Sequence, residues 1–202
     1  MAERSSEVAQ RLADVRRRIE ESCADAGRDP SELTLVVVTK YFPASDVRIL
    51  ADLGVGDVAE NRHQEAVAKV EECADLDLRW HFVGGLQSNK AAAVTSYAAV
   101  VQSVDRPKLL GPLARGAREQ GRVLDVLLQV SLDAPGSGQR SGVPVEELGA
   151  LAARAREHDE LRLRGVMAVA PLGEEPAVAF DRLAHAHAAL LVEHPDATWR
   201  SA

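Results

Sequence analysis

Aromatic residues are scarce in this sequence, and so are cysteines. Only 3% of the 202 residues are aromatic, although 46% are hydrophobic. The core must therefore be built from Val, Leu and Ala, which suits parallel strands covered by helices. The two cysteines, Cys23 and Cys73, are far apart and outside any metal-ligand spacing. This usage argues against a cysteine-based metal site and indicates structural thiols in a reducing compartment, so we expect a cytoplasmic protein with no metal.

Excess positive charge and long apolar runs are missing as well. The net charge is −7 and the isoelectric point is about 5.4. The sequence therefore lacks the excess of basic residues that is typical of proteins that bind nucleic acid or an anionic membrane. No apolar run approaches the roughly 20 residues needed to span a bilayer. The first 30 residues carry acidic side chains without the apolar segment of a secretory signal, and they are typical of an amphipathic helix. We expect a soluble protein with neither nucleic acid nor a membrane as its partner.

Strand-like and helix-like stretches alternate along the whole chain. Apolar, β-branched stretches typical of strands lie at residues 33–40, 55–61, 79–85, 98–105, 123–132, 161–170 and 196–202. Stretches with apolar residues at helical spacing lie at residues 1–30, 44–54, 62–76, 88–97, 106–121, 144–158 and 176–194. Every connection has crossover length, which predicts parallel strands. Because the composition does not change along the chain, we expect one domain spanning residues 1–202.

This alternation predicts an α/β fold, and specifically a (β/α)8 barrel of the TIM type rather than an open doubly wound sheet. A Gly-rich turn of the dinucleotide-binding kind is missing after the first strand-like stretch. A complete eightfold barrel needs about 250 residues. The last strand and the last helix of the barrel are therefore missing from these 202 residues. Either the chain is truncated or they lie beyond Ala202, and we expect the latter.

In such a barrel the active site lies at the C-terminal ends of the strands. The residues found at these ends are Lys40, Glu60, Asn61, His81, Ser103, Asp105, Gln129 and Met167. Each of them could also merely mark the exit of a strand into water. That interpretation is the better one for Asp105, Gln129 and Met167.

Lys40 is the most unusual of these residues. Lysine occurs at only four positions, and Lys40 ends the hydrophobic stretch LTLVVVTK. Desolvation at a barrel mouth favours the neutral amine, which can attack an aldehyde to form a Schiff base. The alternative is that the Lys40 side chain merely extends its charged end into solvent. His81 alternates with Trp80 and Phe82, and it is either a buried core histidine or a residue that faces the site.

Six motifs together resemble one known family. They are, in order, VVVTKYFP, VAENRHQE, WHFVGGLQSNK, VQSVD, LLQVSLD and LRGVMAVAP, and they cover essentially the whole chain. In this order and spacing they resemble the pyridoxal-phosphate homeostasis protein family (YggS/PROSC). The resemblance implies a fold like the N-terminal barrel of alanine racemase. It also implies pyridoxal 5′-phosphate (PLP) held as a Schiff base on Lys40.

The resemblance implies further site residues and a role. Asn61 and His81 stand in motifs that line the cofactor pocket, Met167 lies near the ring of PLP, and Ser201 begins the loop that binds its phosphate. The implied role is to carry PLP for intracellular vitamin B6 homeostasis, without robust catalysis. Apo PLP-dependent enzymes are the candidate partners of a protein that we expect to be a monomer.

Two other functions remain open at this point. The first is a PLP-dependent enzyme that acts weakly on amino acids, as a racemase or a lyase. A barrel racemase needs a second base, which in the alanine racemases is a tyrosine of a second domain, whereas Tyr41 and Tyr97 are the only tyrosines here. The second is a barrel aldolase in which Lys40 attacks a sugar phosphate directly, without a cofactor.

Overall fold

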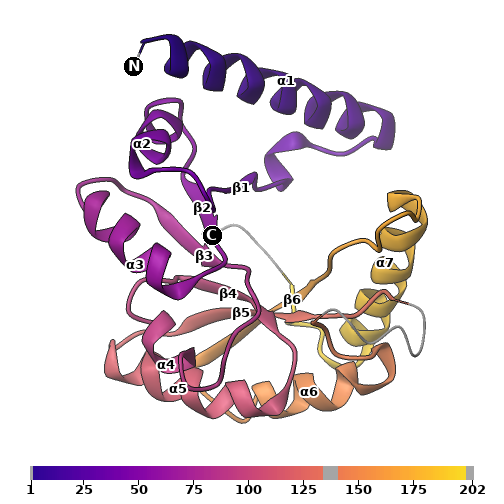
Figure 1. Cartoon of the computed structure of the whole chain (residues 1–202). Coiled ribbons are helices and arrows are strands. Elements are labelled where there is room, and N and C mark those ends of the chain that lie inside the picture. Colours follow the sequence, from indigo (N-terminus) through magenta and orange to yellow (C-terminus); the bar gives the residue numbers. More distant parts are fainter. Residues whose placement is uncertain (1, 134–140, 199–202) are drawn as a thin grey trace. The chain divides into compact units, whose positions relative to one another are not determined.

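The computed structural model describes residues 2–133 and 141–198, and its helices and strands are labelled in Figure 1. The chain divides into two compact units, with the division between Trp80 and His81. Six strands lie within the described residues, and each of them pairs in parallel with at least one other. The parallel α/β arrangement predicted from the crossover connections is therefore confirmed.

The first unit is built around the parallel pair β1 and β2. Its elements are α1 (Ala2–Ala26), the 3-10 helix η1 (Pro30–Glu32), β1 (Val36–Val38), α2 (Ala44–Asp52), β2 (Asp57–Glu60), α3 (His63–Glu72) and the start of β3 (Arg79–Phe82). Val37 of β1 stands opposite Val58 of β2. The Arg79 amide donates a hydrogen bond of 2.8 Å to the Gly56 carbonyl, so β3 begins beside the start of β2.

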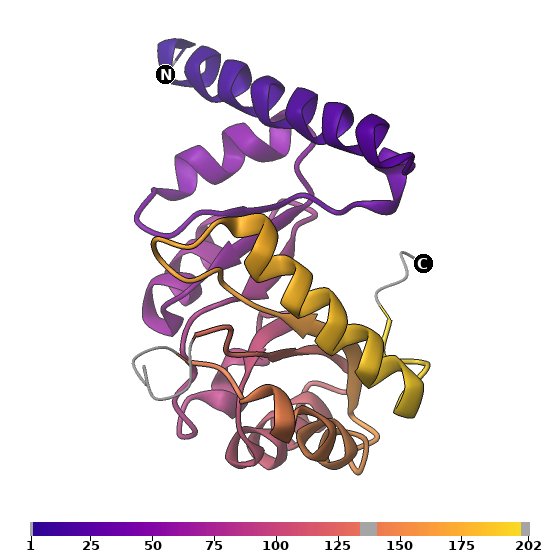
Figure 2. The ribbon, with the colours of Figure 1, turned by 90° about the vertical axis from the view of Figure 1, so that its right-hand side faces the viewer.

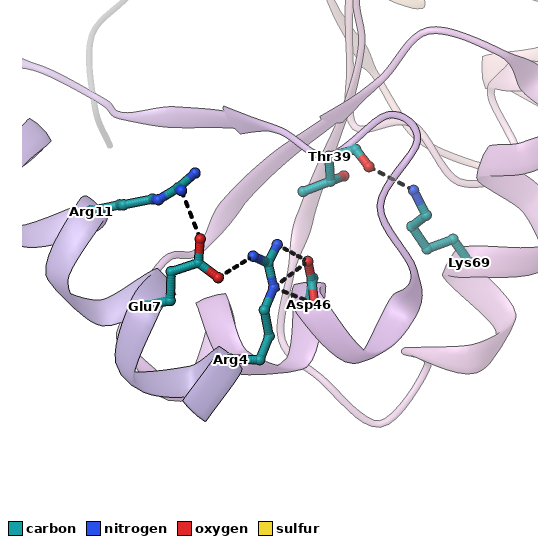
Figure 3. A network of polar contacts seen from close by, with 6 residues as sticks. All are labelled: Arg4, Glu7, Arg11, Thr39, Asp46 and Lys69. Atoms are coloured by element: carbon teal, nitrogen blue, oxygen red, sulfur yellow. Dashed lines mark hydrogen bonds and ion pairs between the residues drawn. The ribbon is translucent and has the colours of Figure 1, made fainter. Parts of the chain in front are cut away.

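An ion-pair network fastens α1 to α2. Arg4 donates to both carboxylate oxygens of Asp46, at 2.6 Å (Oδ2) and 3.3 Å (Oδ1), and to Glu7 at 2.7 Å, so it lies between the two carboxylates in Figure 3. Asp46 is buried in the first turn of α2, where the helix dipole also favours a negative charge. Figures 1 and 2 show α1 lying alongside α2, as this network requires.

The second unit contains β3 to β6, which follow one another in chain order in a parallel sheet. Its elements after β3 are α4 (Ala91–Val94), β4 (Val100–Val104), the 3-10 helix η2 (Pro107–Leu109), α5 (Leu110–Glu119), β5 (Leu124–Gln129), the 3-10 helix η3 (Val145–Glu147), α6 (Leu148–Ala155), β6 (Leu161–Met167) and α7 (Pro176–Glu193). In Figures 1 and 2, α4, α5 and α6 line the same side of these strands.

Aliphatic side chains form the core of the second unit. Val101 in β4 and Val126 and Leu128 in β5 are completely buried. Parallel strands covered by helices bury both of their faces, which explains the nearly continuous apolar runs in these strands. Gly116 lets α5 approach α4 closely, because a Cβ atom at this position would lie 2.6 Å from the Ala92 carbonyl oxygen.

The six strands each lie inside a stretch that the sequence predicts as a strand. The helix predicted at residues 88–97 is shorter, because residues 88–90 form a turn and α4 comprises only Ala91–Val94. Of the seventh strand-like stretch, residues 196–198 form no strand, and residues 199–202 lie outside the described part of the chain. Within the described ranges, none of the helices combines the length and the apolar character needed to cross a membrane.

Candidate functional site

Lys40 lies in a tight turn that directly follows β1. The Thr39 amide donates to the Ala59 carbonyl at 2.9 Å and extends the pairing with β2 by one residue. The Phe42 amide donates back to the Thr39 carbonyl at 3.1 Å, which closes a four-residue turn with Lys40 and Tyr41 at its centre. The turn therefore presents Lys40 at the C-terminal end of β1.

Tyr41 adopts a strained backbone conformation in this turn. Its φ is +69°, and no other non-glycine residue in the described ranges has a positive φ. A left-handed backbone costs an ordinary residue roughly 1–2 kcal/mol, and such strain concentrates at functional sites. Type II turns require a positive φ at their third residue, which is the place of Tyr41 here. The geometry of the turn, and not the preference of tyrosine, therefore sets this conformation.

The Tyr41 ring contacts two cationic groups. Lys40 Nζ lies 5.8 Å from the ring centroid, and the guanidinium carbon of Arg62 lies 5.7 Å from it, both within the range of cation–π interactions. Arg62 also pairs with Glu65 at 2.9 Å, and this hydrogen bond raises the pKa of the guanidinium further. The Lys40 amine therefore shares an exposed aromatic surface with a permanent cation.

No carboxylate pairs with the Lys40 amine in the part of the chain that the structure describes. The contact with the Tyr41 ring is the interaction that its side chain makes there, and the side chain is half-buried. The amine is thus held in place by neither a hydrogen bond nor an ion pair with the described residues. It is available to a ligand.

Lys69, from α3, is placed in the opposite way. Its Nζ donates to the Thr39 carbonyl at 2.9 Å and pairs with Glu60 Oε1 at 2.5 Å. The Thr39 hydroxyl donates to the same carboxylate oxygen at 2.6 Å. Glu60 is 0%, Thr39 2% and Lys69 7% exposed, so the whole cluster is buried. Figure 3 shows the Lys69 side chain reaching toward Thr39.

Asn61 stands just after β2, at the same level of the sheet at which Lys40 stands just after β1. Val38 pairs with Ala59 in the register of the two strands, and Lys40 and Asn61 each stand two residues further on. Asn61 Oδ1 is buried and has no hydrogen-bond partner among the described residues. Because buried polar atoms are normally hydrogen-bonded, this oxygen is a candidate contact for a bound ligand.

His81 lies in the second unit, in β3. Its side chain is 1% exposed, and its Nδ1 lies 2.9 Å from Nε2 of Gln102. This hydrogen bond joins the two side chains, and which partner donates depends on the tautomer of the ring. His81 is therefore a buried histidine whose ring is hydrogen-bonded to Gln102. Its contact with a ligand stays a prediction.

The other strand-end residues of the second unit differ in their surroundings. Ser103 Oγ is buried and lacks a hydrogen-bond partner among the described residues. Gln129 Nε2 donates to the Ser141 carbonyl at 2.9 Å. Met167 ends β6 opposite Gln129 and is half-buried. Ser201 lies outside the described residues.

Sequence reasoning missed three residues around Lys40, namely Thr39, Arg62 and Lys69. A signal for Lys69 exists, because lysine is rare in this chain and Lys69 follows the buried Ala66 by three residues, on the same face of α3. The carboxylate with which it pairs, Glu60, was found as a strand-end residue, but nothing in the sequence links it to Lys69. For a metal, the described ranges contain no group of three or more His, Cys, Asp or Glu side chains that could hold one.

Comparison with known proteins identifies relatives over nearly the whole chain. The model of the alanine racemase N-terminal domain family matches residues 11–199. The pyridoxal phosphate homeostasis protein of Mycobacterium leprae is 38% identical over 220 residues, which cover 99% of this chain and 84% of that protein. The protein of the same name from Pseudomonas aeruginosa is 41% identical over 181 residues, which cover 88% of this chain and 78% of that protein.

Solved structures agree with these relatives. PipY of Synechococcus elongatus PCC7942, solved with PLP bound, has a TM-score of 0.79 at 34% identity and covers 94% of this chain and 84% of its own. An alanine racemase of Clostridium difficile 630 has a TM-score of 0.67 at 12% identity, over 83% of this chain and 44% of its own, which is a likeness of fold alone. The chain therefore belongs to the pyridoxal phosphate homeostasis protein family and has the fold of the alanine racemase N-terminal domain.

Proposed function

We propose that this protein binds PLP through the Lys40 amine and serves intracellular vitamin B6 homeostasis. The observation that carries the proposal is the difference between two lysines at the end of β1. Lys69 is buried in an ion pair with Glu60, whereas Lys40 has no carboxylate partner among the described residues. The names of the relatives and the PLP bound to PipY support the same ligand.

The chemistry of the proposed site is simple. PLP supplies an aldehyde when it is bound, and a primary amine condenses with that aldehyde with release of one water molecule. Lys40 provides this amine. Tyr41 adds an aromatic surface beside it, and Arg62 adds a positive charge that suits an anionic ligand.

The polar groups at the other strand ends fit such a ligand. Asn61 Oδ1 and, in the second unit, Ser103 Oγ are buried atoms for which the described residues supply no hydrogen-bond partner. A polar ligand would satisfy atoms of this kind. We assign Asn61, His81 and Met167 to contacts with PLP and Ser201 to its phosphate.

We further propose that the protein carries PLP and does not turn over an amino acid efficiently. Tyr97 packs against the core of the second unit, and the Tyr41 ring contacts the Lys40 amine itself instead of facing it across a ligand. Neither tyrosine is thus placed like the second base of a racemase. Apo PLP-dependent enzymes are the proposed recipients of the cofactor. The protein would act as a single-domain monomer in the cytoplasm.

Titration of PLP into the purified protein tests the proposal. We expect a visible absorbance band, and an adduct on Lys40 when the loaded protein is reduced with borohydride and mapped by mass spectrometry. Lys40→Ala should lose the band and the adduct, whereas the control Lys108→Ala, at an exposed position, should keep both. Failure to take up PLP, or an adduct on another lysine, would overturn the proposal. Racemisation or elimination of an amino acid by the loaded protein would favour an enzyme instead.

A further inference from the structure

A buried charged pair holds the turn that carries Lys40. We propose that Glu60 and Lys69 are positioning residues, which fix the Thr39 peptide and thereby aim the Lys40 amine at its ligand. This inference rests on the proposed function of Lys40 and deepens it. It concerns contacts within the first unit only.

Thr39 has all of its polar groups engaged. Its amide donates to the Ala59 carbonyl at 2.9 Å, and its hydroxyl donates to Glu60 Oε1 at 2.6 Å. Its carbonyl accepts from the Phe42 amide at 3.1 Å and from Lys69 Nζ at 2.9 Å. The residue that precedes Lys40 is therefore fixed from three directions, by β2, by α3 and by the turn itself.

The charged pair is buried so deeply that its presence needs a reason. Glu60 is completely buried and Lys69 almost so. The free energy that is lost when two charges leave water offsets much of the attraction between them. An apolar pair of similar size would therefore stabilise the fold about as well. An apolar pair would not supply the hydrogen bonds to the carbonyl and hydroxyl of Thr39. The role that we infer for the pair is therefore orientation of the backbone.

Tyr41 makes external support of this turn necessary. A strained φ persists only where the surrounding contacts over-determine the backbone, and the bond from Lys69 acts on the first residue of the turn. Without that bond the turn could relax to a negative φ at Tyr41, and the Lys40 amine would move. The side chain of Lys40 has no hydrogen bond to the described residues, so Glu60 and Lys69 act on it through the backbone alone.

Matched variants of the full chain distinguish an effect on the orientation of the Lys40 amine from an effect on the stability of the fold. Glu60→Leu/Lys69→Met replaces the pair by apolar side chains of similar size and leaves no unpaired charge buried. Lys69→Arg keeps a cation that can pair with Glu60 and donate to Thr39. Asp46→Asn removes the ion pair between α1 and α2 and is the control for a loss of stability without a change at Thr39.

Two measurements report the placement of the Lys40 amine. The first is the rate at which the PLP adduct on Lys40 accumulates under borohydride trapping. The second is the visible circular dichroism of bound PLP, which depends on its fixed orientation. We expect the double variant to be labelled about tenfold more slowly and to show a weakened dichroism band. Lys69→Arg should recover much of both signals, and Asp46→Asn should behave like the wild type.

Equal labelling rates and equal dichroism in the wild type and in the folded double variant would overturn the inference. Absence of label on Lys40 of the wild-type protein would overturn the proposed function instead, so the two failures are distinguishable. Should the double variant not fold, Thr39→Val decides, because it removes the hydroxyl bond to Glu60 and the longer one, of 3.3 Å, to the Ala59 carbonyl, and leaves the ion pair in place. It should give a smaller loss in the same direction, and an unchanged rate and dichroism would then refute the role of the pair.

Discussion

Lys69 Nζ lies 2.9 Å from the carbonyl oxygen of Thr39, the residue that precedes Lys40. One lysine thus holds the backbone from which another presents its amine. Lys69 is paired with Glu60, whereas Lys40 has no carboxylate partner in the described part of the chain. The Glu60 carboxylate therefore distinguishes the two lysines. Lys69 of α3 is ion-paired and supports the backbone, whereas Lys40 is available to a ligand.

Removal of the Lys69 charge alone should be strongly destabilising. Lys69→Met leaves the Glu60 carboxylate buried without a cation, and breaking a buried pair in this way costs about 3–5 kcal/mol. Urea denaturation at neutral pH should show a lowered midpoint of this size. Glu60→Leu/Lys69→Met should recover most of the loss, because no unpaired charge remains.

The exposed Lys108 supplies the control for this prediction. Lys108→Met should change the free energy of unfolding by no more than about 0.5 kcal/mol, as expected for a surface position. If Lys69→Met were as mild as Lys108→Met, the buried ion pair would not have the energetic weight assigned to it.

At position 41, glycine should give a more stable protein than alanine, which is the reverse of the usual order. At an ordinary position alanine is the more stabilising residue, but the φ of +69° favours glycine. Tyr41→Gly should therefore be more stable than Tyr41→Ala by about 1 kcal/mol, as measured by denaturant unfolding. Both variants lose the same ring, which is 68% exposed. The difference between their free energies of unfolding therefore reports the cost of the backbone conformation. An alanine variant at least as stable as the glycine variant would argue against the strained turn.

The positions of the strands could be predicted because each one lies in a compact stretch rich in apolar residues, which is largely buried in β4 and β5 and only partly buried in β1. The rule that sites lie at strand ends also selected Lys40 and Asn61, which the register of β1 and β2 places at the same level. The short α4 was mispredicted, because the alanine-rich stretch 91–93 indicates a longer helix than the one that forms. There the hydroxyls of Thr95 and Ser96 bond back to the Ala92 and Ala93 carbonyls, and the helix ends.

The cluster behind Lys40 could not be predicted in the same way. Its members are 21 and 9 residues apart along the chain, from Thr39 to Glu60 and from Glu60 to Lys69. Their contact depends on how α3 packs against β1 and β2, and local patterns carry no information about that. A lysine on an amphipathic helix is ordinarily assigned to the solvent face, which is the wrong face for Lys69.

Asp75 should contribute to the acid sensitivity of the first unit. Arg48 donates to its two carboxylate oxygens at 2.6 Å and 2.8 Å, and this hydrogen bonding holds the pKa of Asp75 below its ordinary value of 3.8. A carboxyl group with a lowered pKa stabilises the folded state above its unfolded pKa, and this contribution is lost as the pH falls through the folded pKa. Asp75→Asn should therefore be less stable than the wild type at pH 7, and the two should converge once the pH has fallen below the folded pKa of Asp75.

Denaturation curves of the variant and the wild type, recorded at pH 7 and in acid below the folded pKa of Asp75, test this prediction. Asp77→Asn, at an exposed position that forms no ion pair with the described residues, should have the same stability as the wild type at both pH values. A difference between Asp75→Asn and the wild type that persists in acid would mean that Asp75 acts through packing and not through its charge.

Gly116 and Gly111 should respond in opposite directions to the same substitution, although both lie in α5. A Cβ atom at position 116 would lie 2.6 Å from the Ala92 carbonyl oxygen and 2.9 Å from the Ala92 Cα, and backbone atoms cannot move aside without shifting α4. Gly116→Ala should therefore destabilise the protein by about 1–3 kcal/mol. At Gly111 no atom lies within 4 Å of the added methyl group, so Gly111→Ala should stabilise the helix by about 0.5–1 kcal/mol. Thermal or urea unfolding of the two variants measures both values, and a stabilising Gly116→Ala would contradict the close packing of α4 on α5.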